Sequence, residues 1–229
     1  MHTWSGTIIG MSVLHKTAMQ IPHEGPSSDF SAASADAYFS ADVETDGSIP
    51  GPYSILSFAL VFAGSFDGET FSRPEDHSNY FYAELRPIST EFEQEALVVN
   101  GLDRDKLCRE GEDPRAAMTR ASQWVRRIAG KRAPVLVAYP LSFDWSWLYW
   151  YFIRFSADKS PFAYSRCFDI KTAYSIKASV PIAKAGRSRI LSELRPNHVH
   201  THHALDDAIE QAEIFANIFE WAGRNGRNP

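Results

Sequence analysis

Three strand-like runs follow one another in the first part of the chain, and helical and strand-like segments alternate after them. The runs are Tyr38–Asp42, Ser54–Ala63 and Asn79–Leu85, and turns rich in Gly, Pro and Asp separate them. This spacing predicts a three-stranded meander. Further along, Pro134–Tyr139 is short and strongly apolar, which is typical of a strand buried on both faces in a parallel pair. The order of elements predicts an α/β fold.

The predicted helices fill the gaps between these strands and the end of the chain. Glu91–Val99 has a helical pattern, and a firmer helix opens at Asp113, a good N-cap, with Pro114 at its first position. Phe143–Phe155 is dense in aromatic residues and predicts a buried helix. Ala204–Trp221 carries an apolar stripe at helical spacing and closes the domain.

The length and composition predict one domain. A chain of 229 residues with 44% hydrophobic content can form one substantial core without a second domain. We assign this domain to residues 37–222. Residues 1–36 are rich in Ser, Ala, Gly and Pro and predict a flexible extension, and residues 223–229 predict a flexible tail.

The overall charge excludes a broadly basic nucleic-acid-binding surface. The net charge is -5 and the pI is about 5.9, so any contact with nucleic acid has to be local.

Cys108 and Cys167 lie far apart and form no C-x-x-C pair, which argues against a disulfide framework or a zinc ribbon. Since no apolar run is long enough to cross a bilayer, we expect no membrane partner and a cytoplasmic location.

Four acidic residues and one histidine stand in contexts that suit metal chemistry. Asp42 and Glu44 end a strand-like run two positions apart, so both side chains face the same side and can converge on one cation. Asp144 follows an apolar strand directly, and His202 and Asp207 flank the start of the last helix. Carboxylate oxygens favour hard cations such as magnesium or manganese.

Three separated motifs carry a family resemblance. Asp42–Gly47 resembles a D-x-E-T-x-G strand end, Val135–Asp144 resembles an apolar strand followed by F-D, and His202–Ala208 resembles H-x-A-L-x-D-A. Val99–Leu102 is similar to the V-x-G-[IL] turn that often lies between the first two motifs. Together they resemble the histidine-containing (DEDDh) branch of the DEDD superfamily of 3'-5' exonucleases, which includes the proofreading exonuclease, RNase T and oligoribonuclease. The resemblance covers roughly residues 38–221.

The resemblance implies a ribonuclease-H-like fold, with a mixed five-stranded sheet flanked by helices, and a two-metal mechanism. Asp42 would bridge two magnesium or manganese ions, Glu44 and Asp207 would complete one site, and Asp144 would support the other through water. His202 would accept the proton of the attacking water. The implied substrates are single-stranded RNA or DNA 3' ends, which would be cut to nucleoside 5'-monophosphates. A homodimer is plausible because several relatives form one.

Spacing within the third motif separates the histidines from one another. The family places its histidine five positions before the last aspartate, and His202 with Asp207 satisfies this interval, whereas His203 does not. For His198 and His200, simple solvation, or a surface histidine cluster that captures zinc or nickel, is favoured over catalysis. Asp46 is interpreted as a turn residue.

Substrate contacts are less well defined by the sequence. The candidates are Thr45, Phe143, Arg187 and Arg189. Phe143 stands beside Asp144 and could stack on a base, while the two arginines belong to a basic segment that could hold phosphates or remain solvated. The branch often has His-Asn where this chain has Tyr139-Pro140, which weakens the transfer of substrate contacts from this region.

Two other functions are compatible with the same motifs. One is a catalytically silent module on the same fold that binds nucleic acid or a protein partner, because a fold alone does not establish activity. The other is a phosphodiesterase that acts on small nucleotides. Metal-dependent turnover separates the first from an exonuclease, and a preference for dinucleotides over longer strands identifies the second.

Overall fold

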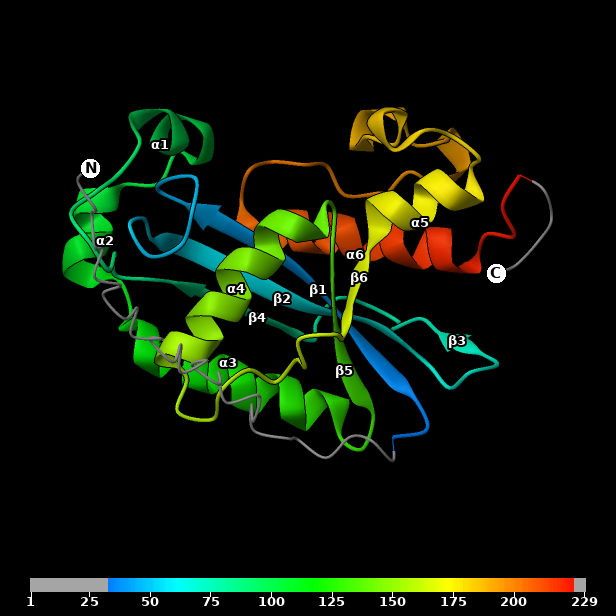
Figure 1. The fold of residues 1–229 in the computed structure, drawn as a ribbon, viewed down its shortest axis with the longest axis horizontal. Coiled ribbons are helices and arrows are strands. Elements are labelled where there is room, and N and C mark those ends of the chain that lie inside the picture. Colours follow the sequence, from blue (N-terminus) through cyan, green and yellow to red (C-terminus); the bar gives the residue numbers. More distant parts are fainter. Residues whose placement is uncertain (1–32, 225–229) are drawn as a thin grey trace, which may run out of the picture.

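The computed structural model describes residues 33–224, which form one mixed sheet with helices around it (Figure 1). The sheet has the order β3-β2-β1-β5-β6, and β4 also pairs with β2. The strands are β1 (Asp36–Thr45), β2 (Ile55–Phe66), β3 (Phe71–Ser72), β4 (Tyr80–Glu84), β5 (Ala133–Ala138) and β6 (Cys167–Asp169). The predicted α/β, ribonuclease-H-like fold is confirmed.

The central strand β1 brings the first two motifs to the same edge of the sheet. It pairs antiparallel with β2 and parallel with β5, and its last partner on β5 places Ser40 opposite Val137. Because parallel strands end at the same edge, the carboxyl end of β1 and the segment after β5 lie close together. All six residues of β5 are buried, as the apolar run predicted.

Helices cover both faces of the sheet. Figure 1 shows α4 in front of the strands and α6 behind them. The helices are α1 (Gln94–Asn100), α2 (Arg104–Glu110), α3 (Pro114–Ala129), α4 (Leu141–Phe155), α5 (Ile170–Lys177) and α6 (Ala204–Glu220). Side chains of α3 and α4 share one core with the sheet, and side chains of α5 and α6 share a second core on the opposite face.

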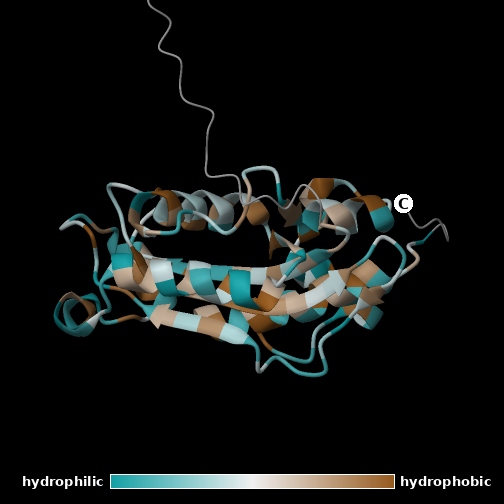
Figure 2. Ribbon diagram, turned by 90° about the horizontal axis from the view of Figure 1, so that it is seen from below, coloured by the Kyte–Doolittle hydropathy of each residue, from teal (hydrophilic) through white to brown (hydrophobic). Residues whose placement is uncertain are grey.

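The helices carry both hydrophobic and hydrophilic residues, as Figure 2 shows in a view from below. This mixture is typical of helices that face a core on one side and solvent on the other. Three short 3-10 turns connect α5 to α6, at Ile182–Lys184, Arg187–Arg189 and Ser192–Leu194. Within residues 33–224, no helix combines the length and the apolar character that crossing a membrane requires.

The sheet has six strands, so the expected number of five is wrong. The additional strand, β3, has only two residues, and it pairs with the end of β2 through Ser65 and Phe66. A strand this short leaves no alternation that a sequence pattern can reveal. The three-residue β6 was not predicted for the same reason. The helices α2 and α5 were not predicted either.

Two helices begin at other residues than predicted. Helix α1 begins at Gln94 rather than Glu91, because the backbone N–H of Glu93 donates to the carbonyl of Asp46 at 2.7 Å and ties this segment to the end of β1. Helix α4 begins at Leu141, two residues before the predicted start at Phe143. Asp144 therefore lies within the first turn of α4.

The domain limits also shift slightly. Strand β1 begins at Asp36, opposite Ala133, so Asp36 belongs to the sheet and not to the predicted extension. Residues 33–35 lead into the strand, and the carbonyl of Ala35 accepts a hydrogen bond from the backbone N–H of Ala133 at 2.8 Å. Residues 1–32 of that prediction lie outside the described residues. At the other end, the backbone N–H of Arg224 donates to the carbonyl of Lys177 at 3.1 Å, and the predicted tail from residue 225 onward lies outside the described residues.

Asp46 locks the turn that follows β1. It is fully buried, and its carboxylate accepts hydrogen bonds from the backbone N–H of Ser54 at 2.5 Å and from Nε of Arg104 at 2.8 Å. Arg104 also donates to the carbonyl of Ser89 at 2.6 Å. Asp46 is thus a turn residue, as predicted, and its ion pair fixes the loop beside the carboxyl end of β1.

Candidate active site

Four carboxylates from three elements gather at the carboxyl end of β1. Asp42 and Glu44 come from β1, Asp144 from the first turn of α4, and Asp207 from the first turn of α6. Glu44, Asp144 and Asp207 are buried, and Asp42 is partly buried. Oxygen atoms of Asp42, Glu44 and Asp207 all lie within 4.8 Å of one another, close enough to share a metal ion.

Asp144 is tied directly to β1. Its Oδ1 accepts a hydrogen bond at 3.2 Å from the backbone N–H of Val43, the residue between Asp42 and Glu44. The structure therefore brings together all four predicted carboxylates, although they are separated by up to 165 positions along the chain.

Gln211 connects two of the motifs and was missed by the sequence interpretation. This fully buried side chain donates from Nε2 to Oδ1 of Asp42 at 2.7 Å and accepts at Oε1 from the backbone N–H of Tyr139 at 2.6 Å. Gln211 lies one helical turn after Asp207, on the same face of α6. A polar residue at this spacing, within the apolar stripe, was the available signal.

We expect Gln211→Leu to weaken manganese binding roughly 10–100-fold, the usual cost of losing a residue that orients a metal ligand. The variant also leaves the buried N–H of Tyr139 without a partner, which should lower the free energy of unfolding by about 1–3 kcal/mol. Calorimetric titration with manganese and urea unfolding measure the two effects. Gln123→Leu, which alters an exposed glutamine on α3, is the control. Unchanged manganese affinity in Gln211→Leu would contradict the assigned role.

Burial and mutual repulsion raise the pKa values of the clustered acids. Burial, followed by Asp144, Glu44 and Asp207, holds the pKa of Asp42 well above its usual range. Burial and the charges of Asp207 and Asp144 raise the pKa of Glu44 to about 8, and burial raises the pKa of Asp144 to about 7. Arg187 opposes the shifts of Asp42 and Asp144. A divalent cation would relieve this repulsion, so the donor set fits a metal ion.

We expect the metal-free protein to lose stability as the pH rises from about 4 to about 8. The ordinary pKa values of Asp144 and Glu44 are 3.8 and 4.5, and their folded values are about 7 and about 8. The folded state therefore holds protons that the unfolded chain has released, and its free energy of unfolding falls with rising pH. Urea unfolding in chelator between pH 5 and pH 8.5 tests this. Asp144→Asn should flatten the decline, and a rising stability would contradict it.

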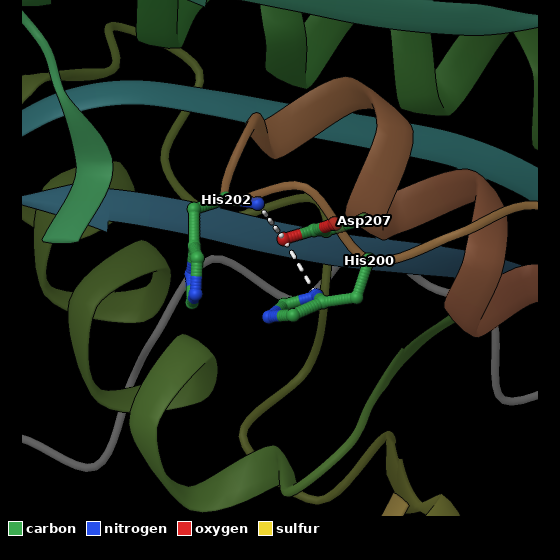
Figure 3. Close-up of side chains that lie close together, drawn as sticks. All are labelled: His200, His202 and Asp207. Atoms are coloured by element: carbon green, nitrogen blue, oxygen red, sulfur yellow. Dashed lines mark hydrogen bonds and ion pairs between the residues drawn. The ribbon is translucent and has the colours of Figure 1, made fainter. Parts of the chain in front are cut away.

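The backbone before α6 holds the predicted histidine beside Asp207 (Figure 3). The N–H of Thr201 donates to Oδ1 of Asp207 at 2.8 Å, and the N–H of His202 donates to Oδ2 at 3.1 Å. His202 has a φ of 58° and an exposed side chain. Left-handed conformations of residues other than glycine are uncommon and cluster at functional sites, where neighbouring contacts hold them.

The other histidines differ in their surroundings. Nδ1 of His200 lies 2.8 Å from Oδ2 of Asp207, so the expectation of simple solvation is wrong for His200. His198 instead pairs with Glu213 at 2.8 Å, and His203 stacks on Tyr82 with ring centroids 5.1 Å apart. The sequence missed the position of His200 because the chain bends back toward α6 between His200 and Ala204, which a spacing argument does not reveal.

The guanidinium group of Arg187 is held by hydrogen bonds beside the site and is not free in solvent. Its Nη1 lies 2.9 Å from Oε2 of Glu210, and its Nη2 donates to the carbonyl of Tyr139 at 3.0 Å. Arg189, in the same 3-10 turn, is exposed, and its carbonyl accepts from the hydroxyl of Tyr174 at 3.1 Å.

The two remaining substrate candidates flank the carboxylates. Phe143 precedes Asp144 on α4 and is 41% exposed, so its ring is accessible. Thr45 ends β1, is buried, and donates from Oγ1 to the carbonyl of Gly47 at 2.8 Å. The side chain of Thr45 thus stabilises the turn after β1. Contact of these two residues with a substrate stays a prediction.

The chain is similar to known exonucleases. No family model matches it. It is 34% identical over 181 residues to the 3'-5' DNA exonuclease Cap18 of Escherichia coli, and this match covers 79% of the chain and 90% of Cap18. The nuclease domain of 3'hExo, a DEDDh family member bound to rAMP, has a TM-score of 0.57 at 16% identity, with 80% of this chain and 90% of that domain covered.

A second solved structure shares the fold but is much longer. Escherichia coli exonuclease I in complex with a dT13 oligonucleotide gives a TM-score of 0.55 at 15% identity, and the match covers 82% of this chain and 41% of that chain. The chain also spans 62% of the 3'-exonuclease seen in recognition of the histone mRNA stem-loop. These structures support the fold.

The sheet order and the likeness to the solved structures define a protein of the ribonuclease-H-like fold class, with acidic residues converging at the end of β1. Within this class, the identity to Cap18 over most of both chains decides the family. The chain belongs to the DEDDh 3'-5' exonucleases, as the three sequence motifs indicated, and it is a 3'-5' exonuclease.

Proposed function

We propose that this exonuclease hydrolyses phosphodiester bonds at the 3' end of single-stranded DNA and releases nucleoside 5'-monophosphates, with two magnesium or manganese ions in its site. The identity to a DNA exonuclease supports DNA as the preferred polymer. RNA is the second candidate, since 3'hExo was solved with rAMP. A cytoplasmic location and a homodimer stay predictions.

The convergence of four carboxylates carries this proposal. Asp42, Glu44 and Asp207 present oxygens within 4.8 Å of one another and would hold one ion. Asp42 would also face the second ion, which Asp144 would support through water. When bound, two divalent ions would stabilise the attacking and leaving oxygens of an in-line displacement. The raised pKa values of Asp42, Glu44 and Asp144 support the binding of a cation, because its positive charge would relieve the repulsion among these acids.

His202 would act as the general base. Its backbone N–H is anchored on Asp207 at 3.1 Å, while its imidazole is exposed and available to a substrate. Imidazole titrates near neutral pH and can accept the proton of the attacking water. Anchoring the backbone on a metal-binding carboxylate would keep the base beside the reacting phosphate.

The substrate contacts follow from exposure. Phe143 would stack on a base near the 3' end, because its ring is accessible and it directly precedes Asp144 on α4. Arg189 is free to meet a phosphate, whereas Arg187 would act through its field on the site, since Glu210 and Tyr139 already occupy its guanidinium group.

Product mapping tests the proposed function. Matched 5'-labelled single-stranded DNA and RNA, together with dinucleotides, would be incubated with magnesium, manganese or chelator. We expect metal-dependent shortening from the 3' end, faster on DNA, and none with Asp42→Asn. Binding of the polymer without turnover in any metal would favour the silent binding module. Faster cleavage of dinucleotides than of longer strands would favour the small-nucleotide phosphodiesterase.

A further inference from the structure

His200 brings a second imidazole to Asp207. The rings of His200 and His202 have centroids 4.4 Å apart at 69° to each other, and Figure 3 shows both rings on the same side of the Asp207 carboxylate. One nitrogen from each ring and one oxygen of Asp207 all lie within 4.8 Å of one another. Within residues 33–224, this group and the Asp42, Glu44 and Asp207 group are the two that could hold a metal ion.

We propose that His200, His202 and Asp207 form an inhibitory metal site that takes zinc or a similar borderline transition-metal ion. Two imidazoles and one carboxylate are a common zinc ligand set that leaves a fourth position open. The carboxylates of Asp42, Glu44 and Asp207 offer only oxygen, which suits magnesium and manganese. The two groups therefore differ in the kind of metal that they favour.

The contact between His200 and Asp207 fits zinc after a small movement. Ligand atoms about 2.0–2.1 Å from a tetrahedral zinc ion lie roughly 3.3 Å apart. Nδ1 of His200 and Oδ2 of Asp207 are 2.8 Å apart, so this pair needs to separate by only a few tenths of an ångström. Both histidine side chains are exposed, and their rings can turn to complete the site, whereas Asp207 is held in place by two backbone N–H groups.

The charged side chains around His200 are compatible with a metal ion bound to His200, His202 and Asp207. Nη1 of Arg187 lies 2.5 Å from Nδ1 of His200, and this contact would have to be given up. Arg187 would keep Glu210 at 2.9 Å and the carbonyl of Tyr139 at 3.0 Å. Glu210 also lies 3.6 Å from Nδ1 of His200 and adds a second carboxylate beside the site.

The two metal sites compete for Asp207, which belongs to both groups. An ion held by His200, His202 and Asp207 withdraws that carboxylate from Asp42 and Glu44 and occupies the imidazole of His202. Zinc should therefore oppose the exonuclease reaction, while His200, two residues before the proposed base, decides how strongly. The inhibition rests on the proposed roles of Asp207 and His202, whereas the binding of zinc does not.

Cobalt absorption tests the binding alone. The full chain, freed of metal, would be titrated with cobalt, whose tetrahedral complexes absorb visible light far more strongly than octahedral ones, and zinc would then be added to displace it. We expect intense bands in the wild type and in the control His198→Ala, whose histidine pairs with Glu213 instead. Cobalt affinity should fall at least about tenfold in His200→Ala. Equal binding by His200→Ala and the wild type would overturn the proposal.

Zinc titration of the nuclease reaction tests the consequence. Each protein would be compared with its own zinc-free rate at fixed magnesium. We expect the zinc concentration for half-inhibition to rise at least about tenfold in His200→Ala and to stay unchanged in His198→Ala. Equal sensitivity of all three proteins would refute inhibition through this site. A wild type without any turnover would instead refute the proposed function, and the cobalt spectra would still decide the metal site.

Discussion

Asp42→Asn is expected to abolish cleavage of single-stranded DNA without weakening the fold. Asparagine keeps the shape of the side chain and can still accept the hydrogen bond that Gln211 donates to Asp42 at 2.7 Å. It removes the charge that would hold the divalent ions. Since bound ions supply several kcal/mol of transition-state stabilisation, cleavage should fall roughly 10³–10⁴-fold or more.

The stability of the same variant separates function from folding. The pKa of Asp42 is raised by burial and by three neighbouring carboxylates, which shows that its charge is costly in the folded, metal-free protein. Removing that charge should leave the free energy of unfolding in chelator unchanged or higher. A site that is arranged for metal binding at the expense of stability behaves in this way.

Cleavage assays at saturating magnesium and urea unfolding in chelator measure the two results. Asp206→Asn is the matched control, because Asp206 adjoins Asp207 but its side chain is 49% exposed and faces Thr201. That control should keep its activity. Retention of cleavage by Asp42→Asn would contradict its role as a metal ligand, and a large loss of stability would contradict the electrostatic account.

His202→Ala is expected to lower the rate of the chemical step by about 10²–10⁴-fold, the usual contribution of a general base. The backbone N–H that donates to Asp207 is retained by alanine, so the carboxylate stays in position. Manganese affinity should therefore change little. A variant that loses rate but keeps its manganese affinity identifies His202 as a general base and not as a metal ligand.

Single-turnover cleavage and calorimetric titration with manganese measure these two quantities in His202→Ala. His198→Ala is the control, since His198 pairs with Glu213 on α6. The control should react at the rate of the wild type. If His202→Ala lost manganese binding in proportion to its rate, His202 would hold the catalytic metal and the base would have to be sought elsewhere.

Much of the fold and of the carboxylate cluster follows from local sequence patterns. Alternation along a strand places Asp42 and Glu44 on one face, and the apolar run before Asp144 brings that residue to the same sheet edge. The interval between His202 and Asp207 identifies the histidine whose backbone N–H contacts that carboxylate.

The remaining features depend on tertiary contacts that no local pattern encodes. Strands β3 and β6 have two and three residues, and pairing with longer neighbours stabilises them. Gln211 has a distinct role only because Asp42 and Tyr139 meet it in space. The path between α5 and α6 consists of short 3-10 turns without sustained periodicity, so the positions of Arg187 and His200 could not be predicted.

Helix α6 connects the parts of the site mechanically. It carries Asp207, then Gln211, whose side chain reaches Asp42, and then Glu213, which accepts hydrogen bonds from the backbone N–H groups of Asn197 and His198. The packing of this one helix against the sheet therefore decides three things. It positions one metal ligand, it orients another, and it anchors the segment that leads to His202. A slight displacement of α6 would disable the chemistry while most of the sheet stays folded, so the rate of cleavage should report the docking of α6 more sensitively than global unfolding does.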